Sequence, residues 1–479
     1  MRDFFSVALV FLLLAAGCAE TPSTDRAAPP SSDRAWVAGD HHIHSRWSVG
    51  WDRTVDPPEP IIGGAAVYPI PMNAIMARRF GLSWMVATDH GGPNHSKVNL
   101  EYAYPELLVS REAVPDLVQF YGMELNTPGG EHSSVIIPHS HDEADALHAI
   151  EQGFDNSDAY PRDPTRNTEE KMIEALEFMR ELASPPVVIA NHPSRTATDM
   201  GVYGSYDPAE LRRWNDTAPE VATGMAGAPG HQASALNPDG SLDPGAARGA
   251  YRYPTMGGFD QMTARLGGFW DSMLGEGRRW WITANSDSHQ HWREGGSDFW
   301  PGEYSKTYVF AEKSYDDIMN GIRSGRIFVT TGDLISELDV TASVDGVDAS
   351  IGGELSVPAG ADVTVTVRIR DPWDPNNNGD TPTVARVDII TGEVGGRLED
   401  PTQDTNPTTR VAQRFTESDW AHDGEYLTMT YLLENVERDG YVRVRGTNTG
   451  ELEPESDPRG EDPWSDLWFY SNPIFLRIR

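Results

Sequence analysis

Two hydrophobic periodicities divide the chain at about residue 333, and this change limits the folds that it can adopt. Over residues 36–333 short apolar runs alternate with segments of helical periodicity, which is the pattern of β-α units. Over residues 334–479 apolar side chains recur at every second position, as in the Val-x-Val-x-Val-x-Ile segment of residues 363–369. We therefore expect an α/β domain followed by a small all-β, immunoglobulin-like sandwich domain.

Individual strands and helices can be assigned within both parts from apolar runs and capping residues. For the helix of residues 168–182, Asn167 and Glu170 form a capping-box pattern before an apolar stripe. A second helix is expected over residues 315–323, with Ser314 as its cap. The expected strands are 83–88, 117–122, 133–137, 187–190, 280–284 and 327–330, and then 338–344, 363–370, 384–390, 426–433, 441–445 and 474–478.

The charge balance limits the possible ligands. The 479 residues include 38 Lys and Arg but 73 Asp and Glu, giving a formal net charge of −35. Such an excess repels a phosphate backbone, so we expect no nucleic-acid-binding surface. A small phosphorylated substrate stays possible, because a metal site brings its own positive charge.

The N-terminus predicts export. Residues 4–17 form an apolar run of the length of a signal-peptide core, too short to span a bilayer as a helix. The segment Leu14-Ala15-Ala16-Gly17-Cys18 resembles the lipobox of bacterial lipoproteins. The resemblance implies a signal peptide over residues 1–18, a lipidated Cys18 and, with Ala19 next in a Gram-negative lipoprotein, anchoring to the outer membrane. Residues 19–35 are rich in Pro, Ser, Thr and Ala and predict a disordered tether. Ordinary signal cleavage is the alternative.

Histidine and carboxylate residues stand where the predicted strands of the first part end. In the segment Asp40-His41-His42-Ile43-His44, His42 and His44 project to one face, because a strand has a period of two. His132 precedes a strand, and the other such residues follow one: His90, Glu124, His192, Asp287 and His289. Imidazole and carboxylate groups gathered at one edge favour zinc, manganese or iron.

In this order the motifs resemble the polymerase and histidinol phosphatase (PHP) family of metal-dependent phosphoesterases. The matching segments are Asp40-x-His42-x-His44, Thr88-Asp89-His90-Gly91, Asn191-His192-Pro193 and Ser286-Asp287-Ser288-His289. The resemblance covers residues 36–333 and implies a distorted (β/α)7 barrel with two or three divalent metals. It implies one metal at His42, His44, Glu124 and Asp287, a second at Glu124, His132 and His192, and a third at His90 and His289. A further ligand of the third metal is missing from the motif, and Asp52 is the nearest candidate.

These ligands imply hydrolysis of a phosphate ester by a metal-bridging hydroxide. Glu124, Asp287 and His289 are the expected catalytic residues, the last two as groups that handle protons. Arg195 and Arg46 are candidates to contact phosphate oxygens. The predicted protein is therefore an exported, membrane-anchored phosphoesterase.

Two other functions stay open at this point. Amidohydrolases, which cleave C–N or carboxylic-ester bonds, also carry an H-x-H motif, but a lysine suited to a carbamate bridge is missing here. A surface lipoprotein that binds a partner without catalysis is the third possibility, and the complete ligand set of the bridged pair argues against it. His95 could touch a substrate, His231 has no ordered motif around it, and residues 374–380 are interpreted as a plain turn.

Overall fold

The computed structural model describes residues 33–479, of which Arg34–Arg479 form one compact unit. The predicted signal peptide, the lipidation site Cys18 and residues 19–32 of the predicted tether lie outside the described residues. Within residues 33–479, no helix has both the length and the apolar character needed to cross a bilayer.

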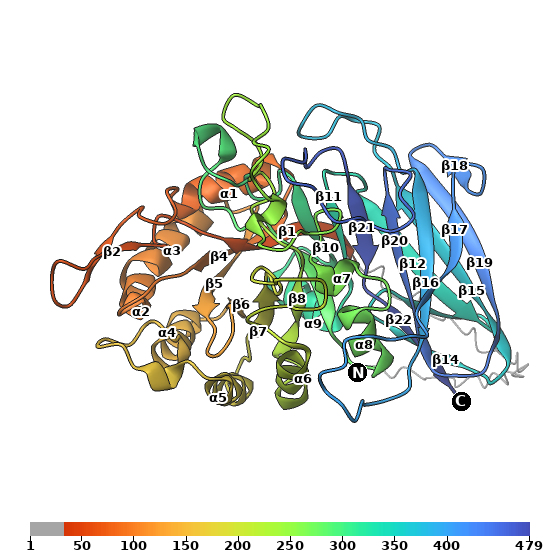
Figure 1. The fold of residues 1–479 in the computed structure, drawn as a ribbon, viewed down its shortest axis with the longest axis horizontal. Helices are drawn as coiled ribbons and strands as arrows, with labels where there is room; N and C mark the ends of the chain where they lie inside the picture. Colours follow the sequence, from red (N-terminus) through yellow and green to blue (C-terminus); the bar gives the residue numbers. More distant parts are fainter. Residues whose placement is uncertain (1–32) are drawn as a thin grey trace, which may run out of the picture. The chain divides into compact units, whose positions relative to one another are not determined.

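A mixed sheet of fifteen strands forms the framework (Figure 1). Its strands from the first part of the chain are β1 (Ala35–Ile43), β4 (Trp84–Asp89), β5 (Val118–Asn126), β6 (His132–Ile137), β7 (Val187–Asn191), β8 (Ala222–Ala228), β9 (Trp281–Ala284), β10 (Ser305–Ala311) and β11 (Ile327–Thr331). Those from the second part are β14 (Glu354–Val357), β16 (Arg386–Glu393), β17 (Arg410–Phe415), β20 (Gly440–Thr447), β21 (Trp468–Ser471) and β22 (Ile474–Ile478). Their order is β14-β22-β20-β21-β11-β10-β1-β4-β5-β6-β7-β8-β9, with β16 and β17 attached at β20.

The expected (β/α)7 barrel is wrong, because the strands do not all run parallel. Strand β6 is antiparallel to both β5 and β7, and β10 is antiparallel to β1 and β11. The short link of residues 127–131 explains the first reversal, since a parallel crossover needs about a dozen residues or more. The pairs β1–β4, β4–β5, β7–β8 and β8–β9 are parallel.

The expected separate sandwich is also wrong, because strands of the second part continue the large sheet. Strand β21 pairs antiparallel with β11, which joins the two parts edge to edge. The remaining strands form a five-stranded antiparallel sheet of β12 (Glu337–Val344), β13 (Val347–Ser350), β15 (Ala361–Arg370), β18 (Ala421–Asp423) and β19 (Tyr426–Val436). Its buried residues, such as Val340 and Val365, share one core with Val387, Val442 and other residues of the large sheet.

The helices cover the large sheet over the first part of the chain. In Figure 1, α4, α5 and α6 lie in a row beside β5 to β8. The helices are α1 (Ile70–Arg79), α2 (His95–Val98), α3 (Tyr104–Ala113), α4 (Glu143–Phe154), α5 (Glu169–Arg180), α6 (Pro208–Thr217), α7 (Gln261–Ala264), α8 (Phe269–Gly275) and α9 (Tyr315–Ser324), and a two-stranded hairpin of β2 (Gly50–Asp52) and β3 (Glu59–Ile61) precedes α1. Thr168 caps α5 and Ser314 caps α9, as each side chain accepts a hydrogen bond from a backbone N–H in the first turn.

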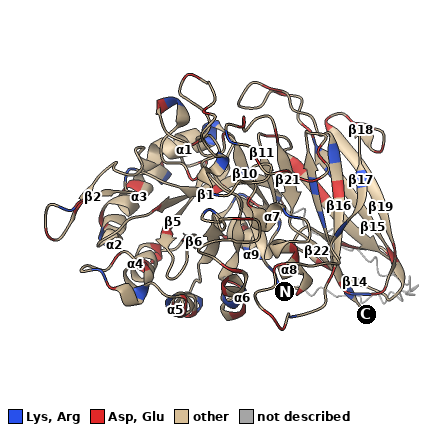
Figure 2. Ribbon diagram, viewed as in Figure 1, with Lys and Arg blue, Asp and Glu red and all other residues tan. Residues whose placement is uncertain are grey.

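Buried ion pairs tie the helical layer to the strands of the second part. Arg443 on β20 donates to Asp271 of α8 at 2.7 Å, and both side chains are almost completely buried. Arg445, on the same strand, pairs with Asp388 of β16 at 3.0 Å. Figure 2 shows Lys and Arg interspersed with Asp and Glu along the described chain. Some of the few basic residues are therefore buried in ion pairs and do not lie on the surface.

The tight pairing of β8 with β9 predicts that Gly224 tolerates no side chain. A Cβ atom on Gly224 would lie 2.0 Å from the backbone oxygen of Trp281, whereas a Cβ on Gly153 in α4 would meet nothing within 4 Å. Gly224→Ala should therefore lower the free energy of unfolding by about 1–3 kcal/mol. Gly153→Ala should leave it unchanged or raise it by up to about 1 kcal/mol. Urea denaturation of both variants tests this, and equal stability of the two would contradict it.

Candidate metal centre

Strand register brings the predicted ligands to one place. In the β5–β6 pair Asn126 lies opposite His132, and in the β6–β7 pair His132 lies opposite Asn191. Glu124, two residues before Asn126, therefore shares a face with His132, and His192 follows at the end of β7. The antiparallel β6 thus places His132 between the other two residues.

A backbone bridge joins the remaining two segments. Ile43 at the end of β1 forms a parallel bridge with Ser288, and the backbone N–H of His44 donates to the carbonyl of Ser288 at 3.0 Å. Asp287 and His289 therefore flank His42 and His44. His90 follows β4, which is parallel to β1, and its ring lies 4.9 Å from that of His44, measured between centroids.

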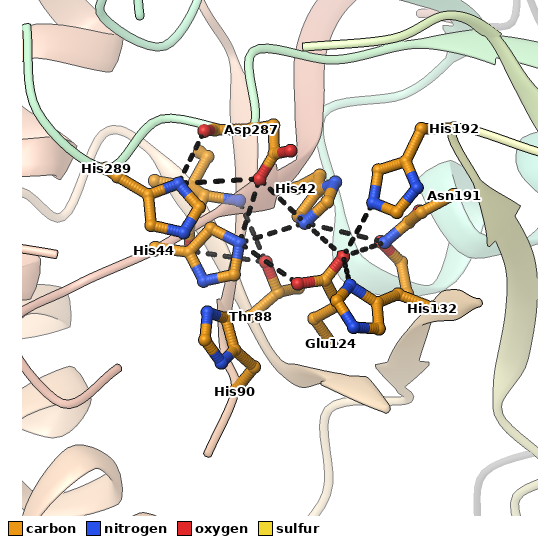
Figure 3. Close-up of polar contacts among 12 residues, drawn as sticks. His42, His44, Thr88, His90, Glu124, His132, Asn191, His192, Asp287 and His289 are labelled. Carbon is orange, nitrogen blue, oxygen red and sulfur yellow. Dashed lines mark hydrogen bonds and ion pairs between the residues drawn. The ribbon is translucent and has the colours of Figure 1, made fainter. Parts of the chain in front are cut away.

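The side chains of four residues converge at the centre of Figure 3. The Nε2 atom of His42 lies 3.0 Å from Glu124 Oε1 and 3.2 Å from Asp287 Oδ1. The Nε2 atom of His44 lies 3.0 Å from the same Asp287 oxygen and 3.5 Å from Glu124 Oε2. The two Nε2 atoms are 2.9 Å apart.

Two further groups overlap with this one. Glu124 Oε1 lies 3.1 Å from His132 Nδ1 and 3.2 Å from His192 Nε2, so this carboxylate belongs to two groups. His44 likewise belongs to a third group, with His90 and His289. All eight predicted metal ligands therefore lie in three overlapping groups: His42, His44, His90, Glu124, His132, His192, Asp287 and His289.

The donor atoms of these groups fit divalent metals. Ligand atoms that surround a cation at about 2.0–2.2 Å lie roughly 3.0–3.5 Å from one another, which is the spacing found here. Asp287 Oδ1 and His132 Nδ1 are buried and make no hydrogen bond, although other ligand atoms lie close to each of them. A shared cation would explain why these two atoms lie close to other ligand atoms without forming hydrogen bonds. The mixture of imidazole and carboxylate suits zinc, manganese or iron.

The surrounding charges keep the two central carboxylates ionised. Burial raises the pKa of Glu124, but His132 and His42 outweigh it and hold that pKa well below its usual range. Burial also raises the pKa of Asp287, and His42 and His231 hold it well below the usual range. Both groups are therefore in the form that binds a cation.

The imidazoles around these carboxylates fall into two sets, with the pKa lowered in one and raised in the other. Burial lowers the pKa of His44 well below its usual range and that of His90 to about 3. Burial also lowers the pKa of His42, but Asp287 and Glu124 outweigh it and raise that pKa to about 9. Burial lowers the pKa of His132 too, but Glu124 outweighs it and raises that pKa, so a bound metal would displace a proton from both His42 and His132.

Neighbouring polar groups fix the orientation of the ligand rings. Ser48 Oγ lies 2.9 Å from His44 Nδ1 and donates to Asp89 Oδ1 at 2.8 Å. Asn191 Nδ2 donates to Glu124 Oε1 at 3.1 Å. Outer contacts of this kind hold metal ligands in place, and their loss weakens metal binding.

Backbone strain is concentrated at the centre. His192, Asp287 and His231 have φ angles of +30°, +48° and +54°, in the region that non-glycine residues rarely adopt. Strained residues of this kind persist where the surrounding structure holds them, and they are common at functional sites.

His231 and Asp298 belong to the centre and were not predicted. His231 Nε2 lies 3.0 Å from Asp287 Oδ2, and its Nδ1 lies 2.5 Å from Asp298 Oδ1. Asp298 Oδ2 in turn accepts the backbone N–H of His289 at 2.7 Å. His231 follows β8, so its position after a strand would have indicated it. That strand, Ala-Thr-Gly-Met-Ala-Gly-Ala, was missed because small residues give a weak strand pattern.

The two predicted phosphate-binding arginines are placed differently. Arg195 lies beside the centre, where Glu131 holds it at 2.5 Å and the charges of Asp287 and Glu124 contribute to raising its pKa. Arg46 forms an ion pair with Glu106 instead.

Two other candidate residues lie outside the ligand groups. Asp52, considered for the third metal, is on β2 and accepts hydrogen bonds from the backbone N–H and hydroxyl of Thr54. His95 is buried, with its Nδ1 2.6 Å from Glu151 Oε1. Neither residue therefore contributes to the centre.

No protein-family model matches this chain, and no curated protein matches it significantly. The functional argument therefore rests on the geometry of the candidate centre and on the sequence motifs.

Because Glu124 belongs to two ligand groups, its substitution should strongly weaken metal binding. Glu124→Gln removes a charge from two ligand groups, so the purified variant should retain fewer metal ions per chain than the unaltered protein. His141→Ala, which removes an exposed histidine outside the groups, is the matched control and should retain the full amount. Elemental analysis after identical metal loading and dialysis measures both, and full metal content in Glu124→Gln would contradict the assignment.

The buried pair of His95 and Glu151 predicts a stability that falls at alkaline pH. Burial lowers the pKa of His95, but Glu151 outweighs it and raises that pKa to about 9, above the value of about 6.5 in an unfolded chain. The stabilisation, on the order of 3 kcal/mol, is thus complete below pH 6.5 and is lost as the pH rises through 9. The difference in unfolding free energy between the unaltered protein and His95→Gln should shrink over this range. A difference that is constant with pH would refute this, and Glu151→Gln should remove the same dependence.

Proposed function

We propose that this protein is a metal-dependent phosphoesterase, exported and held at a membrane by a lipid on Cys18. The observation that carries the proposal is the buried carboxylate of Glu124, which belongs to two ligand groups at once. The resemblance to the PHP family supports it through the order of the ligand motifs. Export and anchoring rest on the sequence of residues 4–18 alone.

Adjacent divalent cations supply an acidified water molecule and polarise the ester that it attacks, which is the chemistry of phosphatases and nucleases with paired metals. His42, His44, Glu124 and Asp287 would hold one cation, and Glu124, His132 and His192 a second. The shared ligand is a glutamate, whereas the amidohydrolase alternative expects a lysine in that role. Phosphate-ester hydrolysis is therefore favoured over C–N hydrolysis.

Arg195 is suited to bind the substrate phosphate. Its side chain is 25% exposed beside a buried centre, and Glu131 fixes its position with one contact at 2.5 Å. The remaining guanidinium N–H groups are free to donate to phosphate oxygens, with which arginine forms paired, charge-assisted hydrogen bonds.

Asp287 and His231 provide a route for a proton. Asp287 Oδ2 lies 3.0 Å from His231 Nε2, and the His231 side chain is 16% exposed whereas Asp287 is buried. Burial lowers the pKa of His231, but Asp287 and Asp298 outweigh it and hold that pKa well above its usual range, so His231 carries a proton that it can pass to Asp287 and replace from solvent. Asp298 keeps the imidazole in place for this transfer through its contact with Nδ1.

Loss of Glu124 should abolish phosphatase activity. With zinc, manganese or iron loaded in turn, the protein should hydrolyse p-nitrophenyl phosphate or bis-p-nitrophenyl phosphate, and Glu124→Gln should lose at least about a hundredfold of kcat/KM. His141→Ala should retain full activity. Hydrolysis of p-nitrophenyl acetate or an anilide without hydrolysis of either phosphate would overturn the proposal and favour the amidohydrolase alternative. If the metal-loaded protein shows none of these activities, the remaining hypothesis is a surface lipoprotein that binds a partner without catalysis.

A further inference from the structure

A cavity lies at the end of the five-stranded sheet, and none of its lining residues belongs to the candidate metal centre. Its volume is about 680 Å³, within the range of roughly 300–1,000 Å³ typical of small-molecule sites. Two stretches of chain form it, one between β15 and β16 and the other around β18. The cavity is therefore large enough for a ligand of more than one ring.

The floor of this cavity contains a carboxylate oxygen without a partner. Asp371 is 9% exposed, and its Oδ2 accepts a hydrogen bond from the backbone N–H of Val384 at 3.0 Å. Its Oδ1 is buried and has no hydrogen-bond partner. This oxygen lies beneath the lining, and because an unpaired buried acceptor costs free energy, a ligand donor that reaches it gains a hydrogen bond. The apolar side chains of Leu427 and Trp420 complete the floor.

The rim carries an aromatic ring that is turned to solvent. Trp373 is 69% exposed, although its backbone is held by a hydrogen bond from its N–H to Glu425 Oε1 at 3.1 Å. Glu425 is itself fixed by Arg370, which donates to its other oxygen at 3.0 Å. A tryptophan that the fold positions but leaves uncovered is a feature of a binding surface.

The turn of residues 374–380 makes the rim rigid. Asn376 Oδ1 accepts the backbone N–H groups of Asn378 and Asp380, both at 3.0 Å, so this segment is the plain turn predicted from its sequence. The side chain of Asn377 donates to the backbone oxygen of Glu303 at 2.8 Å, which ties the turn to the rest of the unit. A site that is rigid before binding loses little entropy when the ligand enters.

The charges of the lining select against anions. Asp371, Glu417 and Glu425 line the cavity, and its lining includes neither lysine nor arginine. The ligand must therefore be uncharged or positive, offer a hydroxyl or similar donor to Asp371, and present an apolar face to Trp373. The ring of a neutral sugar combines these properties, with C–H groups on its face and hydroxyls at its edge.

We propose that this cavity binds a neutral saccharide, whose ring stacks on Trp373 and whose hydroxyl donates to Oδ1 of Asp371. The site is independent of the proposed phosphoesterase activity. It would hold the protein on a glycan surface or present a glycan-linked substrate to it.

Binding of defined oligosaccharides to the purified chain tests this proposal. Cellohexaose, mannohexaose and chitohexaose are titrated by calorimetry, with tryptophan fluorescence as a second signal and hexagalacturonate as the anionic comparison. At least one neutral hexasaccharide should bind saturably, and hexagalacturonate should bind more weakly. Trp373→Ala should weaken binding by about tenfold or more, because an aromatic anchor contributes much of the affinity of such a site.

Two controls make the result specific to the cavity. Tyr102→Ala removes another exposed aromatic ring, outside the cavity, and should leave saccharide affinity unchanged. Asp371→Asn keeps the size of the side chain but removes its charge, and it should also weaken binding. The proposal is wrong if none of the neutral saccharides binds at millimolar concentration, if hexagalacturonate binds best, or if Trp373→Ala binds as tightly as the unaltered chain. Phosphatase assays on Trp373→Ala keep this test separate from that of the metal centre.

Discussion

The carboxylate of Glu124 is the group on which the arrangement of the candidate metal centre depends. It is 2% exposed, and a carboxylate removed from water is stable only among compensating donors or charges. Those donors come from three directions, with His42 on β1, His132 on β6 and His192 after β7. Strand β6 reaches this position only because it runs antiparallel between β5 and β7. The reversal that rules out an all-parallel barrel is thus the feature that completes the centre.

The ligands were predictable because their signal is local. Each stands at the end or start of a short apolar run, and strand ends gather at one edge of a sheet. His231 obeys the same rule but follows a strand of alanine and glycine, where hydrophobic periodicity gives little information. Asp298 lies beyond β9 in an irregular segment, and only the folded chain shows that it holds His231 and the backbone of His289.

The overall architecture was less predictable, because pairing between distant strands leaves little trace in periodicity. Each of the predicted strands overlaps a strand of the structure, yet nothing in the segment of β21 indicates that its partner is β11. The link of residues 127–131 did carry usable information, since its length permits a hairpin and excludes a crossover helix. The alternation of apolar residues in the second part correctly indicated strands with one buried face. The layer against which that face packs, however, is part of the large sheet.

A chain of contacts between irregular segments links the candidate metal centre to the proposed saccharide site. The turn beside the cavity bonds to the backbone of Glu303 through Asn377, and the carboxylate of Glu303 lies 3.0 Å from His291. His291 belongs to the same segment as Asp298, which holds His231 at the metal centre. Contacts alone do not make two sites cooperative, since coupling requires an element with two arrangements. Both sites lie in one compact unit, so a bound saccharide would keep its position relative to the candidate metal centre.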